Sequence, residues 1–306
     1  MRNVFVSTLY DIAKDDKDVV LITGDLGYGV LTKFWEAYPR QFINAGIAEQ
    51  NMTSIAAGMA LERKKVYTYS IGNFPTLRCL EQIRNDVAYH NANVNIVAVG
   101  GGFAYGALGM SHHATEDLAI MRALPNVTVF APGDPVETIE VTKAANEIDA
   151  PCYIRLGKGG EKNVHTKIKN FKVGKAIEIH KGHEICIFST GAILAEANKA
   201  AVNLNNKGIS TSLYSFPTIK PIDKETIIEC AKTHKCIITI EEHNVIGGFG
   251  SSIAEIISEL TEKHAFLRKI GLNDAYSSVV GSQNYLRNYY GICSEKIEEI
   301  ANEVLK

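Results

Sequence analysis

The chain has 306 residues, of which 46% are hydrophobic and 22% are charged, a composition that excludes a disordered or fibrous protein. Its 34 acidic and 32 basic residues leave a formal net charge of -2, which argues against a nucleic-acid-binding surface and an acidic tail. No apolar run is long enough to cross a membrane, and the length suffices for two domains with separate hydrophobic cores.

The first 18 residues mix charged and apolar positions in the pattern of an amphipathic helix, unlike the apolar centre of a signal peptide. The cysteines are scattered through the sequence without a CxxC pair, which predicts reduced thiols in apolar surroundings. They are Cys79, Cys152, Cys186, Cys230, Cys236 and Cys293. We therefore expect a cytoplasmic protein.

Strands and helices are predicted to alternate after this first helix, and a buried strand over 19–22 ends in a glycine-containing loop. The further strands are predicted over 42–43, 65–69, 93–99, 127–129 and 152–156, and the helices from Glu49 and over 77–89, 116–124 and 136–147. This alternation predicts an α/β domain over residues 1–160 with a doubly wound, mainly parallel sheet.

A polar and basic segment over 161–175 lacks periodicity, which predicts an exposed linker. Beyond it, a smaller α/β domain with a mixed sheet is predicted over 176–306. Its strands are expected near 177 and over 185–188, 210–214, 237–240 and 266–270, and its helices over 192–205, 224–232, 250–260 and 294–305.

The helix that begins near Glu49 alternates apolar and very small residues, so we expect it to be buried and closely approached by another backbone. Burial disfavours the charged form of a carboxyl group, so an unpaired Glu49 could hold a proton on a ring nitrogen of a bound cofactor. The alternative is a first-turn acid that only favours the helix dipole.

Two glycine-rich loops follow predicted strands, at 24–27 and 100–109, where open α/β sheets bind ligands. Neither loop has a GxGxxG or Walker pattern. His112 and His113 are adjacent, so they point apart and are not expected to share a metal ion. One of them could donate a proton or hydrogen bond to a polar ligand, or both could simply face solvent.

Arginines could bind an anion near the same loops. Arg155 ends a predicted strand, where its guanidinium could meet an anion at the sheet edge or reach only water. Arg2 is a weaker candidate because residues near a terminus are usually solvated. The run Glu241-Glu242-His243 is interpreted as an exposed charged turn rather than an acid–base site.

Several motifs together resemble the C-terminal half of transketolase, in the same order and over nearly the whole chain. They are KVYTYS (65–70), GIAEQNMTSIAAGMAL (46–61), GALGMSHHATEDLAIMRALPNVTVFAPGDPVET (106–138), CYIRL (152–156), FPTIKPID (216–223) and EEHNVIGGFG (241–250). The resemblance implies a pyrimidine-binding domain followed by the transketolase C-terminal domain.

Full-length transketolases have an N-terminal domain that grips thiamine diphosphate through Mg²⁺, using a GDG motif and a downstream asparagine. That half does not occur in this sequence. The resemblance therefore implies a split enzyme, in which an N-terminal subunit supplies the metal ligands and two copies of each chain form a heterotetramer. The implied reaction is the transfer of a two-carbon ketol unit from a ketose, or its phosphate, to an aldose.

For the cofactor, the resemblance implies that Glu49 hydrogen-bonds the aminopyrimidine ring and promotes its imino tautomer. Asp25 and Leu26 match the loop that approaches the cofactor at the subunit interface. The aromatic residue that stacks on the pyrimidine follows a Ser-Thr pair in the family, but Ile71 and Gly72 stand at the aligned positions. Phe74, or the aliphatic face of Ile71, is expected to replace it.

For the substrate, the resemblance implies that His112 contacts the donor carbonyl and hydroxyl groups. It also implies that Arg155 and Arg2 bind the substrate phosphate. The alternatives are a related thiamine-diphosphate synthase, a subunit of a 2-oxo-acid decarboxylating enzyme, or a regulatory subunit without catalysis.

The sequence departs from the family at three substrate-contacting positions. Leu108 replaces an aspartate that selects hydroxyl configuration, Gly100 replaces a phosphate-contacting histidine, and Gly29 replaces a phosphate-contacting serine. A deoxy, branched or otherwise modified sugar would suit this more apolar pocket.

Overall fold

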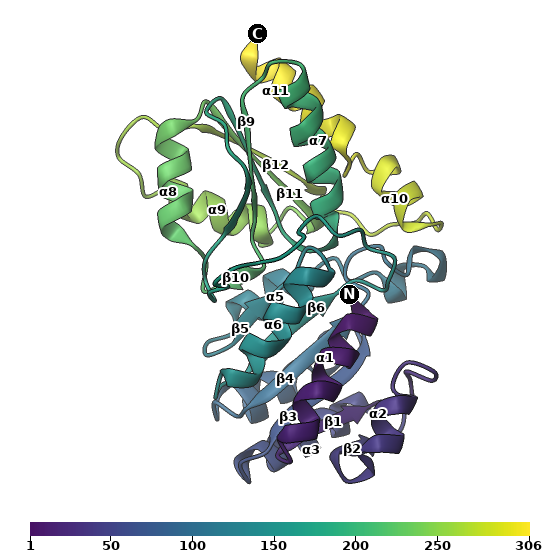
Figure 1. Ribbon diagram of the computed structural model, residues 1–306. Coiled ribbons are helices and arrows are strands. Elements are labelled where there is room, and N and C mark those ends of the chain that lie inside the picture. The colour runs from purple at the N-terminus through teal and green to yellow at the C-terminus, as the bar shows by residue number, and fades with distance from the viewer.

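Two sheets, one above the other in Figure 1, form the framework of the computed structural model, which describes residues 1–306. The lower sheet has seven strands in the order β10-β5-β6-β4-β3-β1-β2, and all its pairs are parallel except β10 with β5. The strands are β1 (Val19–Thr23), β2 (Phe42–Asn44), β3 (Lys65–Ile71), β4 (Val94–Val99), β5 (Thr128–Phe130), β6 (Cys152–Leu156) and β10 (Thr218–Lys220). The predicted mainly parallel sheet is confirmed.

The upper sheet has five strands in the order β12-β11-β8-β9-β7, and only β7 is antiparallel to its neighbour. The strands are β7 (Ile177–His180), β8 (Ile185–Ser189), β9 (Thr211–Ser215), β11 (Cys236–Asn244) and β12 (Phe266–Leu272). The predicted mixed sheet is thus confirmed as well.

The helices connect these strands, and none of them is long and apolar enough to span a membrane. They are α1 (Arg2–Asp15), α2 (Thr32–Ala37), α3 (Glu49–Leu61), α4 (Leu80–Gln82), α5 (Asp117–Ala123), α6 (Pro135–Glu147), α7 (Leu194–Asn206), α8 (Lys224–Thr233), α9 (Phe249–Ile257), α10 (Gln283–Tyr289) and α11 (Ser294–Leu305). Short 3₁₀ turns and a π-helical segment over Ile83–Ala88 replace much of the helix predicted over 77–89.

Alternating side chains of the central strands face opposite layers of helices, as the twofold period of a strand requires. In β1, Val19 and Leu21 pack in one apolar cluster with residues of α1 and α6, whereas Val20 and Ile22 pack in another with residues of α3 and α5. Every side chain of β1 is buried, and the strand is apolar up to its last residue, Thr23.

Each sheet has an apolar cluster largely of its own, but a third cluster spans both sheets. A cluster of 34 buried residues includes Val20 of the lower sheet and also Phe188 and Ile237 of the upper sheet. In addition, β10 lies beyond residue 176 in the sequence but pairs with β5 of the lower sheet, at the junction seen in Figure 1. The two sheets therefore share both an apolar core and a strand connection.

The segment over 161–175, predicted to be an exposed linker, is anchored at its centre. The backbone N–H groups of Val164 and His165 donate to Asp134 Oδ2 at 2.9 and 2.8 Å, and His165 Nδ1 lies 3.1 Å from the same oxygen. Burial raises the pKa of Glu137 beside them to about 7. Burial lowers the pKa of His165, but Asp134 and Glu137 outweigh that effect and raise it above the ordinary value.

Candidate active site

Three loops meet at the carboxyl ends of β1, β3 and β4, the edge where parallel sheets bind ligands. The strand register places Thr23 beside Tyr69 and Ile71 beside Val99. The three strands therefore end within two residues of one another along the sheet, and the loops that follow them lie at the same edge. A Cβ atom on Gly24 would lie 3.4 Å from Glu49 Cγ. The loop after β1 therefore runs directly against the first residue of α3.

Glu49 is 3% exposed, and its carboxylate forms an ion pair with Arg78, whose Nη1 donates to Glu49 Oε2 at 2.8 Å. The condition considered from the sequence, a carboxyl group without a partner, is thus not met in this chain. Arg78 is 48% exposed, and its guanidinium carbon lies 4.7 Å from the centroid of the Phe74 ring. The sequence carried no signal for Arg78, because the pair spans 29 residues.

Aromatic side chains extend the site from Phe74 toward the loop after β4. The rings of Phe74 and His112 meet edge to face with centroids 5.3 Å apart. The centroids of the Tyr105 and His112 rings are 6.4 Å apart. Ser111 Oγ lies 3.0 Å from His112 Nδ1. A continuous row of contacts thus joins Glu49, through Arg78 and Phe74, to His112. Ile71 is half-buried at the end of β3.

The two adjacent histidines point to different surroundings. His113 is buried against Phe103, with ring centroids 5.2 Å apart, and its Nε2 lies 3.3 Å from the carbonyl oxygen of Gly106. Burial lowers the pKa of His113, so the neutral form is favoured. Only His112 is therefore placed beside Phe74.

The loop after β1 is held by polar contacts around Asp25. Its carboxylate accepts hydrogen bonds from Asn44 Nδ2 and from the Tyr28 hydroxyl, both at 2.9 Å, and these bonds lower its pKa, that from Asn44 most strongly. Asn44 Oδ1 in turn accepts from the backbone N–H of Gly46 at 3.0 Å. Leu26 is half-buried, and its carbonyl oxygen accepts from the Thr23 hydroxyl. These bonds connect the loop to the residues before α3.

The guanidinium of Arg155 is bound by groups within this chain. Its side chain is 4% exposed, and its Nε donates to Asp117 Oδ2 at 2.8 Å while its Nη2 donates to the carbonyl oxygens of Ala114 and Glu242. Its expected role in binding substrate phosphate therefore has no support in this geometry. Arg155 instead ties the loop after β4 to the upper sheet.

The prediction of an exposed charged turn at 241–243 was wrong. All three residues lie in β11, and none is more than 2% exposed. Glu241 accepts from the backbone N–H groups of Phe249 and Gly250 at the start of α9, and Glu242 accepts from Arg287 Nε at 2.7 Å. The sequence did not reveal these partners because they lie in separate elements.

A cavity of 340 Å³ adjoins the loop after β4, lined in part by Tyr105, Leu108 and Lys158. Lys158 Nζ lies 4.8 Å from the centroid of the Tyr105 ring. Burial raises the pKa of Tyr105, and the nearby charge of Arg2 opposes that rise. Two cations and an aliphatic side chain thus surround Tyr105.

The backbone conformation and the neighbouring Tyr105 ring explain why position 100 is a glycine. Its φ angle is +91°, and a Cβ atom there would lie 2.2 Å from the Tyr105 ring. Tyr105 thus fills the space into which a side chain at position 100 would project, so only glycine is compatible with this loop.

Comparisons with known families bear on both halves of the chain. Residues 1–160 match the model of the transketolase pyrimidine-binding domain, and residues 174–297 match that of the transketolase C-terminal domain. The chain belongs to the transketolase family.

Family members of similar length support this assignment. The chain is 37% identical over 309 residues to a putative transketolase C-terminal section of Methanocaldococcus jannaschii, covering 100% of this chain and 96% of that protein. It is 36% identical to one subunit of the apulose-4-phosphate transketolase of Phocaeicola vulgatus, covering 100% of this chain and 97% of that subunit. It is also 32% identical to a 1-deoxy-D-xylulose-5-phosphate synthase of Heliobacterium modesticaldum, but it spans 46% of that enzyme.

A solved structure has the same fold. It is a split-gene transketolase in an inactive β₄ tetramer, 34% identical to this chain, with a TM-score of 0.89 and coverage of 99% of this chain and 97% of that one. The chain is therefore similar over its whole length to proteins named as one part of a divided transketolase.

Proposed function

We propose that this chain is the C-terminal subunit of a split, thiamine-diphosphate-dependent transketolase that moves a two-carbon ketol unit from a ketose or its phosphate to an aldose or its phosphate. The observation that carries the proposal is the buried carboxylate of Glu49, aligned with Phe74 and His112 at the carboxyl ends of parallel strands. A carboxylate that faces this edge but is shielded from water suits proton exchange with a ring nitrogen.

The residues around Glu49 fit an aminopyrimidine. Gly24 allows the loop after β1 to approach the carboxylate closely, and Phe74 and Ile71 offer apolar surface. Asp25 and Leu26 would line the edge that faces the partner subunit. Bound thiamine diphosphate would supply the carbon nucleophile that ketol transfer needs. This chain would hold the pyrimidine, and the partner would provide the ligands for Mg²⁺ and grip the diphosphate.

Arg78 adds a step to cofactor binding. Its Nη1 donates to Glu49 Oε2, so a cofactor that takes over this contact must displace the guanidinium. Because Arg78 is half exposed and lies on the face of Phe74, it can move without breaking the core. Arg78 thus satisfies the buried carboxylate until the cofactor takes its place.

Substrate recognition is assigned to the residues near the 340 Å³ cavity. His112 would hydrogen-bond the donor sugar, and Arg2 and Lys158 would attract a phosphate group through their charge. Leu108 is 55% exposed and offers no hydrogen bond, which disfavours a hydroxyl group beside it. This arrangement supports a deoxy or branched sugar phosphate, and one relative is named for a particular sugar phosphate, apulose 4-phosphate.

The face of α3 that points away from the core is proposed to pack against other subunits. Ile47, two residues before the helix, and Leu61, its last residue, are 77% and 58% exposed, and no atom lies within 4 Å of a Cβ placed on Gly58. Ala48 is also exposed, so another backbone could approach closely there. We place this surface inside a heterotetramer of two copies of each chain. All six cysteines are free, which suits a cytoplasmic enzyme.

The decisive experiment combines this chain with its N-terminal partner subunit, Mg²⁺ and thiamine diphosphate, and measures ketol transfer across a panel of sugars and sugar phosphates. Transfer that requires both chains supports the proposal. Release of carbon dioxide from pyruvate would instead identify a synthase or decarboxylase, and failure of the assembled chains to bind the cofactor would identify a regulatory subunit.

A further inference from the structure

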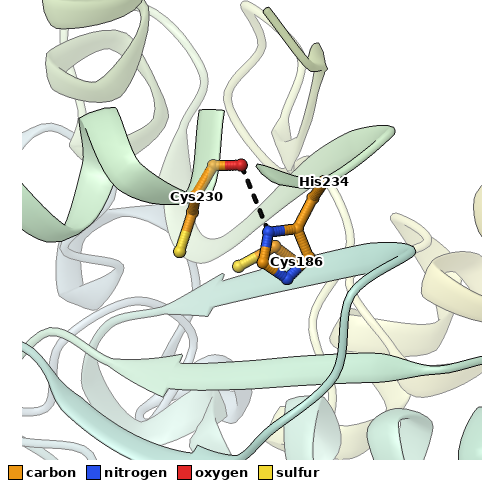
Figure 2. Close-up of side chains that lie close together, drawn as sticks. All are labelled: Cys186, Cys230 and His234. Carbon is orange, nitrogen blue, oxygen red and sulfur yellow. Dashed lines mark hydrogen bonds between the residues drawn. The ribbon is translucent and has the colours of Figure 1, made fainter. Parts of the chain in front are cut away.

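Two cysteines and a histidine meet on one face of the upper sheet, far along the chain from the candidate active site. Cys186 lies in β8, Cys230 lies in α8, and His234 follows the last residue of that helix. One ligand atom from each of the three side chains lies within 4.8 Å of the other two. Figure 2 shows the three side chains close together. Cysteines 44 positions apart in the sequence thus share one site.

The local structure explains this meeting. Cys186 and Phe188 face the layer that contains α8, whereas Ile185 and Ile187 face the opposite layer. The backbone N–H of His234 donates to the carbonyl oxygen of Cys230 at 3.1 Å, which continues the helical hydrogen bonding by one residue. Residues four positions apart share a helix face, so His234 and Cys230 both turn toward Cys186.

The imidazole of His234 is oriented as a metal ligand requires. Nδ1 lies 3.2 Å from the carbonyl oxygen of Cys230, the contact drawn in Figure 2, and a carbonyl can only accept the proton. That assigns the proton to Nδ1 and leaves a lone pair on Nε2. In this tautomer Ser212 Oγ donates to Nε2 at 3.0 Å, and a metal ion that takes that lone pair lets the hydroxyl turn its proton to the carbonyl oxygen of Gly182 at 3.1 Å.

We propose that Cys186, Cys230 and His234 bind a zinc ion. Two thiolates and an imidazole form a soft ligand set that suits Zn²⁺, and a histidine whose second nitrogen donates to a backbone carbonyl is the usual arrangement at such sites. Zn–S bonds of about 2.3 Å and Zn–N bonds of about 2.0 Å place tetrahedral ligand atoms about 3.5–3.8 Å apart. Small side-chain rotations from the present spacing are sufficient.

The ion would serve folding rather than catalysis. It would connect β8 to the end of α8, and water or a nearby polar oxygen would complete the coordination, which leaves the site more open than the four-ligand structural zinc sites. On binding, each thiol releases its proton to solvent, and no oxidation state changes. His234 is half-buried, which leaves a route for the ion to enter.

The test uses the full chain, purified with a chelator and a phosphine reductant and then freed of chelator. Zinc is titrated against a competing chromogenic chelator, and Co²⁺ serves as a spectroscopic probe of thiolate ligation. We expect one zinc ion per chain and a thiolate-to-cobalt charge-transfer band. A chain that takes up less than one equivalent, or whose cobalt complex lacks that band, overturns the proposal.

Variants locate the site. Cys230→Ser and His234→Gln should each weaken zinc binding more than the about 10–100-fold that loss of an outer-shell partner costs. Cys293→Ser, which changes a cysteine outside the cluster, should bind zinc as the unchanged chain does. If Cys230→Ser does not fold, the partly exposed His234 variant decides the question. Equal affinity in all variants would show that zinc binds elsewhere and would overturn the assignment.

Discussion

Arg78 donates a 2.8 Å hydrogen bond to Glu49, so the buried carboxylate at the start of α3 is already paired within this chain. Arg78 belongs to a short 3₁₀ turn after β3. It contacts Glu49 and the ring of Phe74, which in turn contacts His112. The pair gives a physical reason why a buried acid is tolerated before any cofactor arrives, because an unpaired buried charge is costly.

Glu49→Ala and Glu49→Gln should each lower ketol transfer by the assembled enzyme by about 10²–10⁴-fold, because the proton exchange assigned to this carboxyl group is lost. Steady-state kinetics with saturating cofactor measures the effect. Glu81→Ala, an exposed acid in α4, is the matched control and should retain activity. Full turnover in either Glu49 variant would remove Glu49 from the mechanism.

Arg78→Ala should behave differently, because we assign Arg78 to the resting chain and not to the chemistry. The free energy of unfolding should fall by about 1–3 kcal/mol, since the buried carboxylate of Glu49 loses its hydrogen-bond donor. Activity should stay within about 10-fold of the unchanged enzyme, a loss of about 1.4 kcal/mol or less. A loss as large as that in Glu49→Ala would mean that Arg78 contacts the reacting groups.

Leu108→Asp tests the assigned specificity. A carboxylate at this exposed position offers a hydrogen-bond acceptor to a sugar hydroxyl, so kcat/KM should rise for an ordinary ketopentose phosphate relative to a deoxy or branched one. Competition between the two sugars in one reaction measures the ratio directly. Leu108→Asn separates hydrogen bonding from charge, and an unchanged ratio in both variants would place the substrate elsewhere.

Gly100→Ala should destabilise the chain by more than Gly29→Ala. Both residues have positive φ angles, +91° and +75°, so both substitutions bear the backbone strain of about 1–2 kcal/mol. Only at position 100 does the new methyl group meet the Tyr105 ring, whereas nothing lies within 4 Å at position 29. Chemical denaturation gives the two free energies, and equal losses would show that Tyr105 moves freely.

The anchor at His165 predicts a pH-dependent stability. Because the folded state raises the pKa of His165 above the unfolded value of about 6.5, its stabilising contribution is complete below that pH. The contribution is lost as the pH rises through the folded value. The unfolding free energy of the unchanged chain should therefore exceed that of His165→Gln by more at pH 6 than at pH 8. A constant difference would contradict the pairing with Asp134 and Glu137.

Much of the fold could be predicted from the sequence because its central strands are buried on both faces, which gives apolar runs such as residues 96–99. Residues whose role depends on distant partners could not be predicted in this way. Arg155 was interpreted as reaching water or an anion, but it is bound by Asp117 of another element. Glu242 was interpreted as part of an exposed turn, but it is bound by Arg287. Likewise, β10 has only three residues, and its partner β5 lies about 90 positions earlier.

The pairing of β10 with β5 determines where the protein can be shortened without loss of the fold. A fragment that stopped near residue 160 would lack β10, so one side of β5 would present unpaired backbone groups to solvent. It would also lack Phe188 and Ile237, which close the shared apolar cluster from above. Such a shortened chain would be expected to self-associate, so the smallest stable fragment must extend past residue 220.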